Sequence, residues 1–352
     1  MVWIVATTSV VGTGVALTLA GGDDGFVSRD VVLGSGNGRA VDFGGNGTII
    51  IVHGSIVGAQ AITTGSARNS TIAIEAEGRV TGLFSDPLVT DSGNAINLQG
   101  GTSTIRNEGI IEALGGGNAI SYTASQSLTP ITAISLENNG LISGQNAILL
   151  GGLNGGISFD LLNTGRIEAE AIAFRDSSDQ GSTDTLVNRG FIAGAVDLGL
   201  GDDSFDGRGG RLDGLLSGGA GNDTLRSGAD ADTIVGGGGQ DRLFGGRGAD
   251  RFVFDQGPGT TDADRIEDFG RPDRIHLDSA DFTALADGAL AAGAFRANAS
   301  GRAADASDRI VYETDTGWLR YDADGRGGSA GVRFAQLDAG LRFVDAGDFL
   351  VI

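Results

Sequence analysis

Apolar residues recur with a period of nine between residues 218 and 253. The stretch reads GGAGNDTLR, SGADADTIV, GGGGQDRLF and GGRGADRFV, and each unit approaches G-G-x-G-x-D-x-U-x, where U is a large apolar residue. The first six residues of a unit predict a turn, because glycine adopts positive φ at little steric cost. The last three predict a short strand with one inward side chain, supplied in turn by Leu225, Ile234, Leu243 and Phe252. A single unit cannot bury that residue, so the units must stack.

A longer repeat occupies residues 1–197. A glycine followed two places on by a β-branched residue recurs at solenoid-like intervals of 24, 31, 31, 25 and 25 residues. The pairs are Gly54/Ile56, Gly78/Val80, Gly109/Ile111, Gly140/Ile142, Gly165/Ile167 and Gly190/Ile192. Each is followed by an Ala-Ile or similar pair, the last two at 171–172 and 195–196. Asn107, Asn138, Asn163 and Asn188 precede four of these glycines by two places, so we expect them to stack and to hydrogen-bond to one another.

These patterns predict an all-β chain, because no window shows a sustained 3.6-residue apolar period. We expect a parallel β-helix of about seven or eight coils in 1–197 that continues into the nine-residue units of 198–253, with a β-rich module in 254–352. Extra loop is expected near 83–94, and a second insertion is shared between 115–117 and 121–130. A β-sandwich is the competing interpretation for 1–197.

Residues 1–22 carry no charge. A first solenoid coil is expected there, with a cleaved signal as the alternative, and a membrane span is not expected.

The module at 254–352 contains further strand-like segments. Strands are expected at 251–254, 265–269 and 274–277, with acidic turns between them. Residues 308–337 predict a β-hairpin followed by a third strand. The chain ends in AGDFLVI.

The charge balance narrows the possible partners. The formal net charge is −21 at pH 7, and all 24 basic residues are arginine. Nucleic-acid binding is not expected, because phosphate contacts require clustered cations. The negative charge favours divalent cations and makes the cation-free chain repel itself. Cysteine is absent, which excludes disulfides and thiolate metal sites.

The acidic position of each nonapeptide is a candidate cation ligand. Asp223, Asp232, Asp241 and Asp250 occupy it, and carboxylates together with exposed turn carbonyls are the ligands that Ca²⁺ prefers. Upstream, LGLGDDSFD at 198–206 carries Gly201 and Asp203 in the same phase. Residues 209–217 form a degenerate unit without the Asp.

The four units resemble the RTX, or haemolysin-type, calcium-binding family. That resemblance implies a parallel β-roll in which Ca²⁺ lies between unit n and unit n+2. One calcium site would therefore lie between the turns at 218–223 and 236–241. A second would lie between the turns at 227–232 and 245–250, and it is weakened because Asp230 replaces a glycine there. The ligand positions implied are Gly201, Asp203, Gly218, Gly219, Gly221, Asp223, Ala229, Asp230, Asp232, Gly236, Gly237, Gly239, Asp241, Gly245, Gly246, Gly248 and Asp250.

The segment 252–277 resembles the module that follows RTX arrays in serralysin-type secreted metalloproteases. The C-terminal tail is similar to the uncleaved signal of type I (ABC-transporter) secretion substrates, although such a tail is also compatible with a final strand. The resemblance therefore implies an extracellular bacterial protein whose partners include the type I secretion apparatus.

No catalytic motif accompanies the array. Only His53 and His276 are present, and H-E-x-x-H does not occur. GGSAG at 327–331 matches G-x-S-x-G but has no downstream histidine, so a glycine loop is expected. The sequence favours a secreted calcium-binding protein whose β-helix has a structural or surface-binding, adhesin-like role, toward cell-surface glycan or its own copies. The alternative is a glycan-active lyase or epimerase that uses solenoid acids such as Glu75, Glu108, Glu112, Glu168 and Glu170.

Overall fold

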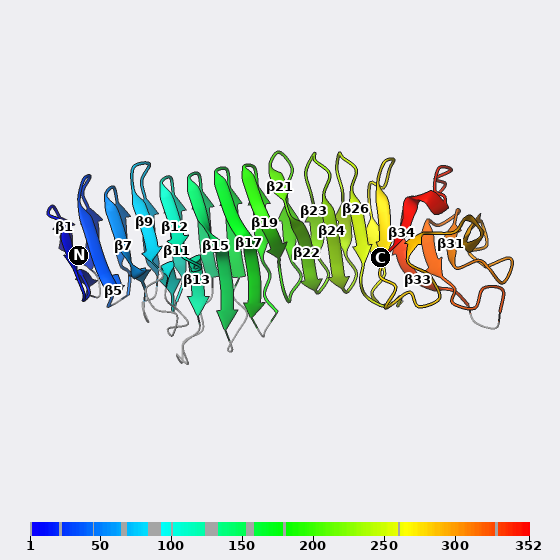
Figure 1. Ribbon diagram of the computed structural model, residues 1–352, viewed down its shortest axis with the longest axis horizontal. Coiled ribbons are helices and arrows are strands. Elements are labelled where there is room, and N and C mark those ends of the chain that lie inside the picture. Colours follow the sequence, from blue (N-terminus) through cyan, green and yellow to red (C-terminus); the bar gives the residue numbers. More distant parts are fainter. Residues whose placement is uncertain are drawn as a thin grey trace. The chain divides into compact units, whose positions relative to one another are not determined.

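The computed structural model describes residues 2–20, 23–44, 46–64, 69–83, 93–99, 101–123, 133–152, 158–178, 181–259, 261–327 and 330–352. Most of the loop predicted at 83–94, part of that at 121–130 and Ser329 of the GGSAG stretch lie outside the described residues. The chain forms two compact units: Met1–Leu200 with Gly209–Gly214, and Gly201–Arg208 with Leu215–Ile352. The fold is all-β, as predicted (Figure 1).

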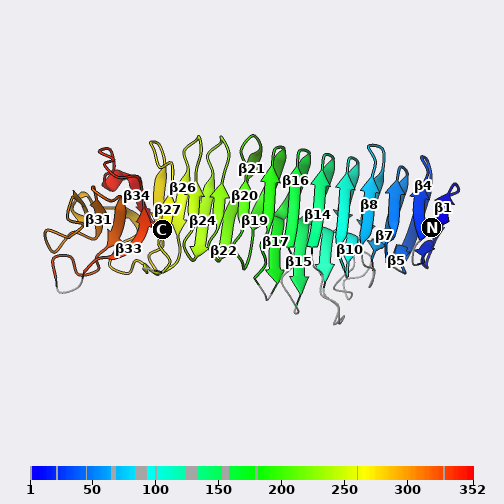
Figure 2. The same cartoon turned by 180° about the vertical axis from the view of Figure 1, so that it is seen from behind.

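The first unit is built from parallel strands. One sheet contains β1 (Val2–Ala6), β4 (Asp23–Val27), β6 (Ile49–Val52), β8 (Ser70–Ile74), β11 (Ser103–Asn107), β14 (Ala133–Asn138), β16 (Ser158–Asn163) and β18 (Thr185–Asn188). Each strand pairs with the strand of the next coil: β11 pairs with β8 and with β14, and β14 pairs with β16, beside which it lies in Figure 2.

The remaining strands of this unit form the other walls of the coils. They are β2 (Val10–Gly12), β3 (Leu17–Leu19), β5 (Val32–Phe43), β7 (Ser55–Thr63), β9 (Arg79–Leu83), β10 (Asn94–Leu98), β12 (Ile110–Leu114), β13 (Asn118–Thr123), β15 (Leu141–Gly152), β17 (Arg166–Ser178), β19 (Phe191–Asp197) and β21 (Arg211–Asp213). They also pair in parallel, so residues at equivalent positions of successive coils stack.

The predicted glycine anchors are in register. The residue two places after each glycine forms one buried column: Ile56, Val80, Ile111, Ile142, Ile167 and Ile192. The close approach of coils explains the glycine, because a side chain at Gly140 would collide with the carbonyl oxygen of Gly109. The strand-and-turn pattern was therefore sufficient to locate these corners.

The Ala-Ile prediction was wrong at one coil. Phe174, and not Ile172, aligns with Ile148 of the preceding coil and Val196 of the following one. The register of β17 shifts between Glu168 and Ile172, so its buried pair is Ala173-Phe174. A bulge of this kind is not visible as a break in the sequence, because Ala171-Ile172 and Ala173-Phe174 are equally apolar.

In the second unit the strands are shorter. One sheet contains β20 (Ser204–Asp206), β23 (Thr224–Arg226), β25 (Arg242–Phe244), β27 (Asp264–Ile266), β33 (Val332–Gln336), β32 (Trp318–Tyr321), β31 (Ile310–Glu313) and β30 (Phe295–Asn298). The other contains β22 (Leu215–Ala220), β24 (Thr233–Gly238), β26 (Arg251–Phe254), β28 (Arg274–Leu277), β34 (Phe349–Val351) and β29 (Gly288–Ala289).

The C-terminal part of this unit agrees with the predicted strands, except that β27 is shorter than 265–269 and begins at Asp264. The predicted hairpin and third strand are β31, β32 and β33, which pair antiparallel. The helices that the structure describes are two single 3₁₀ turns, η1 (Ala292–Ala294) and η2 (Ala346–Asp348), and neither could cross a membrane.

Candidate calcium-binding site

The nonapeptide strands stack in two columns. Phe205, Leu225 and Leu243 align on β20, β23 and β25, while Leu216, Ile234 and Phe252 align on β22, β24 and β26. All six side chains are fully buried. Units n and n+2 are therefore neighbours, as the resemblance implied.

The glycines of the turns hold the backbone in conformations that other residues avoid. Gly219, Gly221, Gly237 and Gly239 all have positive φ, between 100° and 138°. A side chain at Gly221 would collide with the carbonyl oxygen of Gly201. Main-chain oxygens of neighbouring turns are thus packed against one another with no side chain between them.

One column of carboxylates follows the first set of turns. Asp203 donates its main-chain N–H to Oδ1 of Asp223 (2.7 Å), and Asp223 donates to Oδ1 of Asp241 (2.7 Å). Asp241 in turn donates to Oδ1 of Asp264 (3.1 Å). All four side chains are at most 3% exposed. Each carboxylate is therefore held in place by the main chain of the preceding turn.

A second column follows the turns of the other side. The main-chain N–H of Asp232 donates to Oδ1 of Asp250 (2.9 Å), and that of Asp250 donates to Oδ1 of Asp273 (3.1 Å). Oδ2 of Asp232 accepts from the main-chain N–H of Gly228 (3.1 Å). The two columns repeat the same arrangement.

The second carboxylate oxygen has no comparable partner. Oδ2 of Asp223, of Asp241 and of Asp250 is buried and has no hydrogen bond. A point beside Gly236, where a side chain would begin, lies close to Oδ2 of Asp241 and 2.9 Å from Oδ2 of Asp264. Buried anionic oxygens without a donor are unfavourable unless a cation or a proton neutralises them. The donor set of carboxylate and main-chain oxygens is the one that Ca²⁺ prefers.

The pKa values of these aspartates also indicate that the buried carboxylates need a cation or a proton. Burial, opposed in part by the N–H of Asp203 and reinforced by the carboxylates of Asp241 and Asp203, raises the pKa of Asp223 to about 7. Burial and nearby carboxylates raise the pKa of Asp250 to about 6. Burial and the neighbouring Asp241 raise the pKa of Asp264 to about 9. Without a cation these sites favour the protonated form.

The predicted site residues are brought together with two exceptions. Ala229 and Asp230 are exposed, and Asp230 does not have the positive φ of Gly221, Gly239 and Gly248 at the same place in their units. Its main-chain oxygen faces Gly248. Burial raises the pKa of Asp232, and the carboxylate of Asp230 raises it further. In the described residues, no three acidic, histidine or cysteine side chains gather closely enough to hold a metal alone. Main-chain oxygens must supply the remaining ligands.

The sequence analysis missed Asp264, Asp268 and Asp273. Asp264 and Asp273 end the two columns, and Asp268 accepts hydrogen bonds from the main-chain N–H groups of Gly245 and Gly246 (both 2.9 Å). A signal was present in the sequence. Residues 264–266 and 273–275 both read D-R-I, which matches the D-x-U positions of the nonapeptide. It was hidden because only the first glycine of the G-G-x-G pattern, Gly259, precedes Asp264 at its expected place, and none does so before Asp273.

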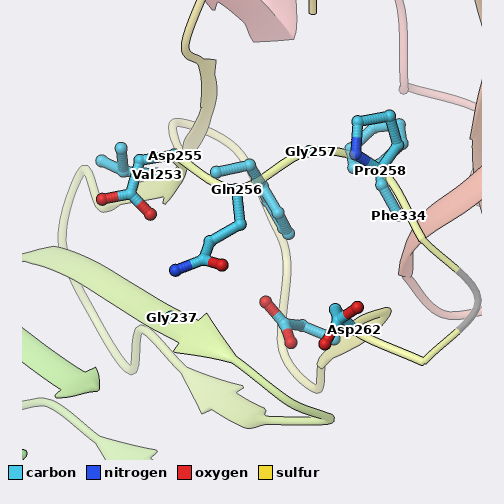
Figure 3. A pocket seen from close by; sticks show the side chains of 10 residues that line it. Gly237, Val253, Asp255, Gln256, Gly257, Pro258, Asp262 and Phe334 are labelled. Atoms are coloured by element: carbon cyan, nitrogen blue, oxygen red, sulfur yellow. The ribbon is translucent and has the colours of Figure 1, made fainter. Parts of the chain in front are cut away.

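A small polar pocket adjoins the end of the first column. Its lining includes Gly237, Gln256, Asp262 and Asp264. Figure 3 shows the side chains of Gln256 and Asp262 beside the strand that carries Gly237.

Comparison with known proteins identifies this region. Residues 217–252 match the family model of the RTX calcium-binding nonapeptide repeat, in four copies. These residues are an RTX array. RTX nonapeptide repeats bind Ca²⁺, and proteins that carry them are typically secreted. No curated protein and no solved structure matches the chain. The likeness of the following segment to the serralysin module stays a prediction.

Proposed function

We propose that the chain is a secreted protein whose RTX array folds on binding Ca²⁺ outside the cell. The observation that carries this is the pair of carboxylate columns, in which Oδ2 of Asp223, Asp241 and Asp250 is buried without a hydrogen bond. A divalent cation supplies the positive charge that such oxygens lack.

The array residues have distinct tasks in this proposal. Asp223 and Asp241 hold the cation of the turns at 218–223 and 236–241, while Asp232 and Asp250 hold that of the turns at 227–232 and 245–250. Main-chain N–H groups orient the carboxylates of Asp241 and Asp250 through Oδ1 and leave Oδ2 of both for the metal. The turn glycines allow the carbonyl oxygens to approach. The second site is the weaker, because Asp230 replaces a glycine.

Calcium dependence would couple folding to export. With a net charge of −21 the calcium-free chain repels itself, which keeps the array unfolded where free Ca²⁺ is scarce. Extracellular calcium sites typically have dissociation constants of about 10⁻⁴–10⁻³ M, so the array would fold after export. Export would use a type I secretion apparatus.

The β-helix of the first unit would serve a structural or surface-binding role. The solenoid acids considered as catalytic residues are dispersed: Glu112 accepts hydrogen bonds from Arg79 (2.7 Å) and Thr81 (2.8 Å), and Glu168 pairs with Arg166. These contacts suit pairing between and along the strands better than proton transfer. We therefore retain the adhesin-like role, toward glycan or another copy.

The test is a calcium titration followed by far-UV circular dichroism, with magnesium as the control cation. Ca²⁺ near millimolar should increase the β signal of the purified chain, and Mg²⁺ should not. Asp223→Ala with Asp241→Ala should abolish most of the gain. Asp287→Ala, which removes an exposed acid outside the array, should not change it. An equal response to Mg²⁺, or none to Ca²⁺, would contradict the proposal.

A further inference from the structure

A second acidic loop lies in the C-terminal module, outside the RTX array. It follows β32 and reads D-A-D-G-R-G from Asp322 to Gly327. The hairpin β31–β32 pairs Ile310 with Tyr321, and the main-chain N–H of Asp322 continues the ladder by donating to the carbonyl oxygen of Arg309 (2.8 Å). Asp322 therefore lies where the hairpin meets the loop 304–308.

Asp322 is buried although it carries a charge. Its side chain is 5% exposed, and its Oδ1 has no hydrogen-bond partner. Burial raises its pKa, and the neighbouring carboxylate of Asp324 raises it further, while the main-chain N–H of Gly325 acts in the opposite direction. The side chains of Asp322 and Asp324 also share a hydrogen bond, which two ionised carboxylates make only with a proton or a cation between them.

The loop folds tightly around these carboxylates. Gly325 has a positive φ of 68°, and a side chain there would come within 2.9 Å of the carbonyl oxygens of Asp305 and Ala306. At Gly327 a side chain would come within 2.9 Å of the whole carboxylate of Asp324. Glycine at both places lets main-chain oxygens and carboxylates approach each other without intervening carbon atoms.

The neighbouring loop is ordered by its own acids. Oδ2 of Asp308 accepts from the main-chain N–H groups of Ala304 (2.6 Å) and Asp305 (3.3 Å), and its side chain is 3% exposed. This network turns the chain so that the carbonyl oxygens of Asp305 and Ala306 face Gly325. Each carbonyl oxygen has two lone pairs, so it can bind a cation while it accepts one hydrogen bond.

The geometry points to a divalent-cation site, of the kind that takes Ca²⁺, formed by the carboxylates of Asp322 and Asp324 and the carbonyl oxygens of the loop 304–308. Acids at alternate positions followed by glycine also begin the calcium loops of EF-hands, where the turn brings successive oxygens to one ion. The site is separate from the RTX turns, and none of its ligands comes from the array.

A luminescent lanthanide can report this site selectively. The RTX array at 217–252 contains neither Trp nor Tyr, whereas Trp318 and Tyr321 lie on β32 next to Asp322. Terbium bound at Asp322 and Asp324 should therefore emit when the aromatic side chains are excited, since energy transfer falls steeply with distance. Terbium in the array should contribute little.

The experiment compares the full-length chain with matched variants in a terbium titration. Asp324→Asn, at an exposed position, should weaken the apparent affinity for terbium, measured by the sensitised emission, about tenfold. Asp315→Asn should not, because it removes the same charge from the turn at the other end of the hairpin. Millimolar Ca²⁺ should displace the terbium.

Two further results decide between this site and the array. Emission retained in Asp223→Asn with Asp241→Asn would support a separate site, even if the array no longer responds to Ca²⁺. The inference is overturned if Asp324→Asn titrates like Asp315→Asn, if the emission disappears only with the array variants, or if Ca²⁺ fails to displace terbium.

Discussion

Both units stack a polar side chain at one corner of successive coils, but the chemistry of the two stacks is opposite. In the first unit, Nδ2 of Asn107 donates to Oδ1 of Asn138 (2.8 Å), Asn138 to Asn163 (2.7 Å) and Asn163 to Asn188 (2.8 Å). In the second unit the corner residue is Asp, and the donor is the main chain of the neighbouring turn.

The difference follows from the inventory of donors and acceptors. A side-chain amide has both, so a column of Asn residues completes itself and carries no charge. An ionised carboxylate has only acceptors, so a column of Asp residues accumulates negative charge, and Oδ2 of Asp223, Asp241 and Asp250 is left without a hydrogen bond. The first stack is neutral, and Oδ1 of Asn107 at its end is buried without a partner, whereas the second stack needs a cation.

Removal of calcium should have the largest effect. With a chelator the second unit should lose its β structure, because several buried carboxylates remain uncompensated. The first unit should remain folded, because its ladder is neutral. Hydrogen exchange followed by mass spectrometry would localise the change. Equal loss of protection in residues 103–197 and 218–253 would contradict the comparison.

Acid should partly replace calcium. The folded pKa values of Asp223, Asp250 and Asp264 are raised to about 7, 6 and 9, above an ordinary value of 3.8. Between the unfolded pKa of 3.8 and the raised folded pKa of each Asp, the calcium-free folded array therefore binds more protons than the unfolded chain. Its free energy of unfolding falls as pH rises through that range. From pH 5 to pH 8 we expect a loss of at least about 3 kcal/mol in the second unit.

The measurement is urea unfolding in chelator at several pH values, followed by the fluorescence of Trp318 and by circular dichroism. With saturating Ca²⁺ the dependence should largely disappear, because the metal displaces the protons. A calcium-free array that is more stable at pH 8 than at pH 5 would have the opposite sign and would contradict the assignment.

Charging the neutral ladder should reproduce the defect of the array. In Asn138→Asp the donor to Asn163 and to the carbonyl oxygen of Arg166 is lost, and a buried negative charge is introduced. We expect the first unit to lose about 2 kcal/mol at pH 7, and less at pH 4, where the new carboxyl is protonated. Asn139→Asp, next to the ladder at an exposed position, is the control for charge in chemical denaturation.

Neutralising one carboxylate of the array should have the smallest effect on stability. Without calcium the change should be a gain in stability, opposite in sign to the losses above. Asp223→Asn keeps Oδ1 for the main-chain N–H of Asp203, and its amide can donate to the carbonyl oxygen of Gly236. We expect a gain of about 1 kcal/mol in chelator and a weaker response to Ca²⁺. Calorimetric titration would measure the second effect; an unchanged affinity would remove Asp223 from the site.

Much of both units was predictable because their repeats place residues by period. The Gly–x–Ile anchors and the Asn residues two places before them lie in register as expected. The inward residues Leu225, Ile234, Leu243 and Phe252 are fully buried. Where the period slips, prediction failed: the bulge in β17 moved the buried position from Ile172 to Phe174.

The sequence by itself determined the phase of the RTX array and its demand for a cation, because only glycine fits the positive-φ turns and only Asp stands at each sixth position. The tertiary structure alone decided how far the carboxylate columns extend. Asp264 and Asp273 lie 23 residues beyond Asp241 and Asp250, in loops without the glycine pattern, and join the columns through main-chain hydrogen bonds. It also decided that Oδ1 of Asp322 is buried. Burial depends on which strands and loops pack together, and local spacing does not encode that.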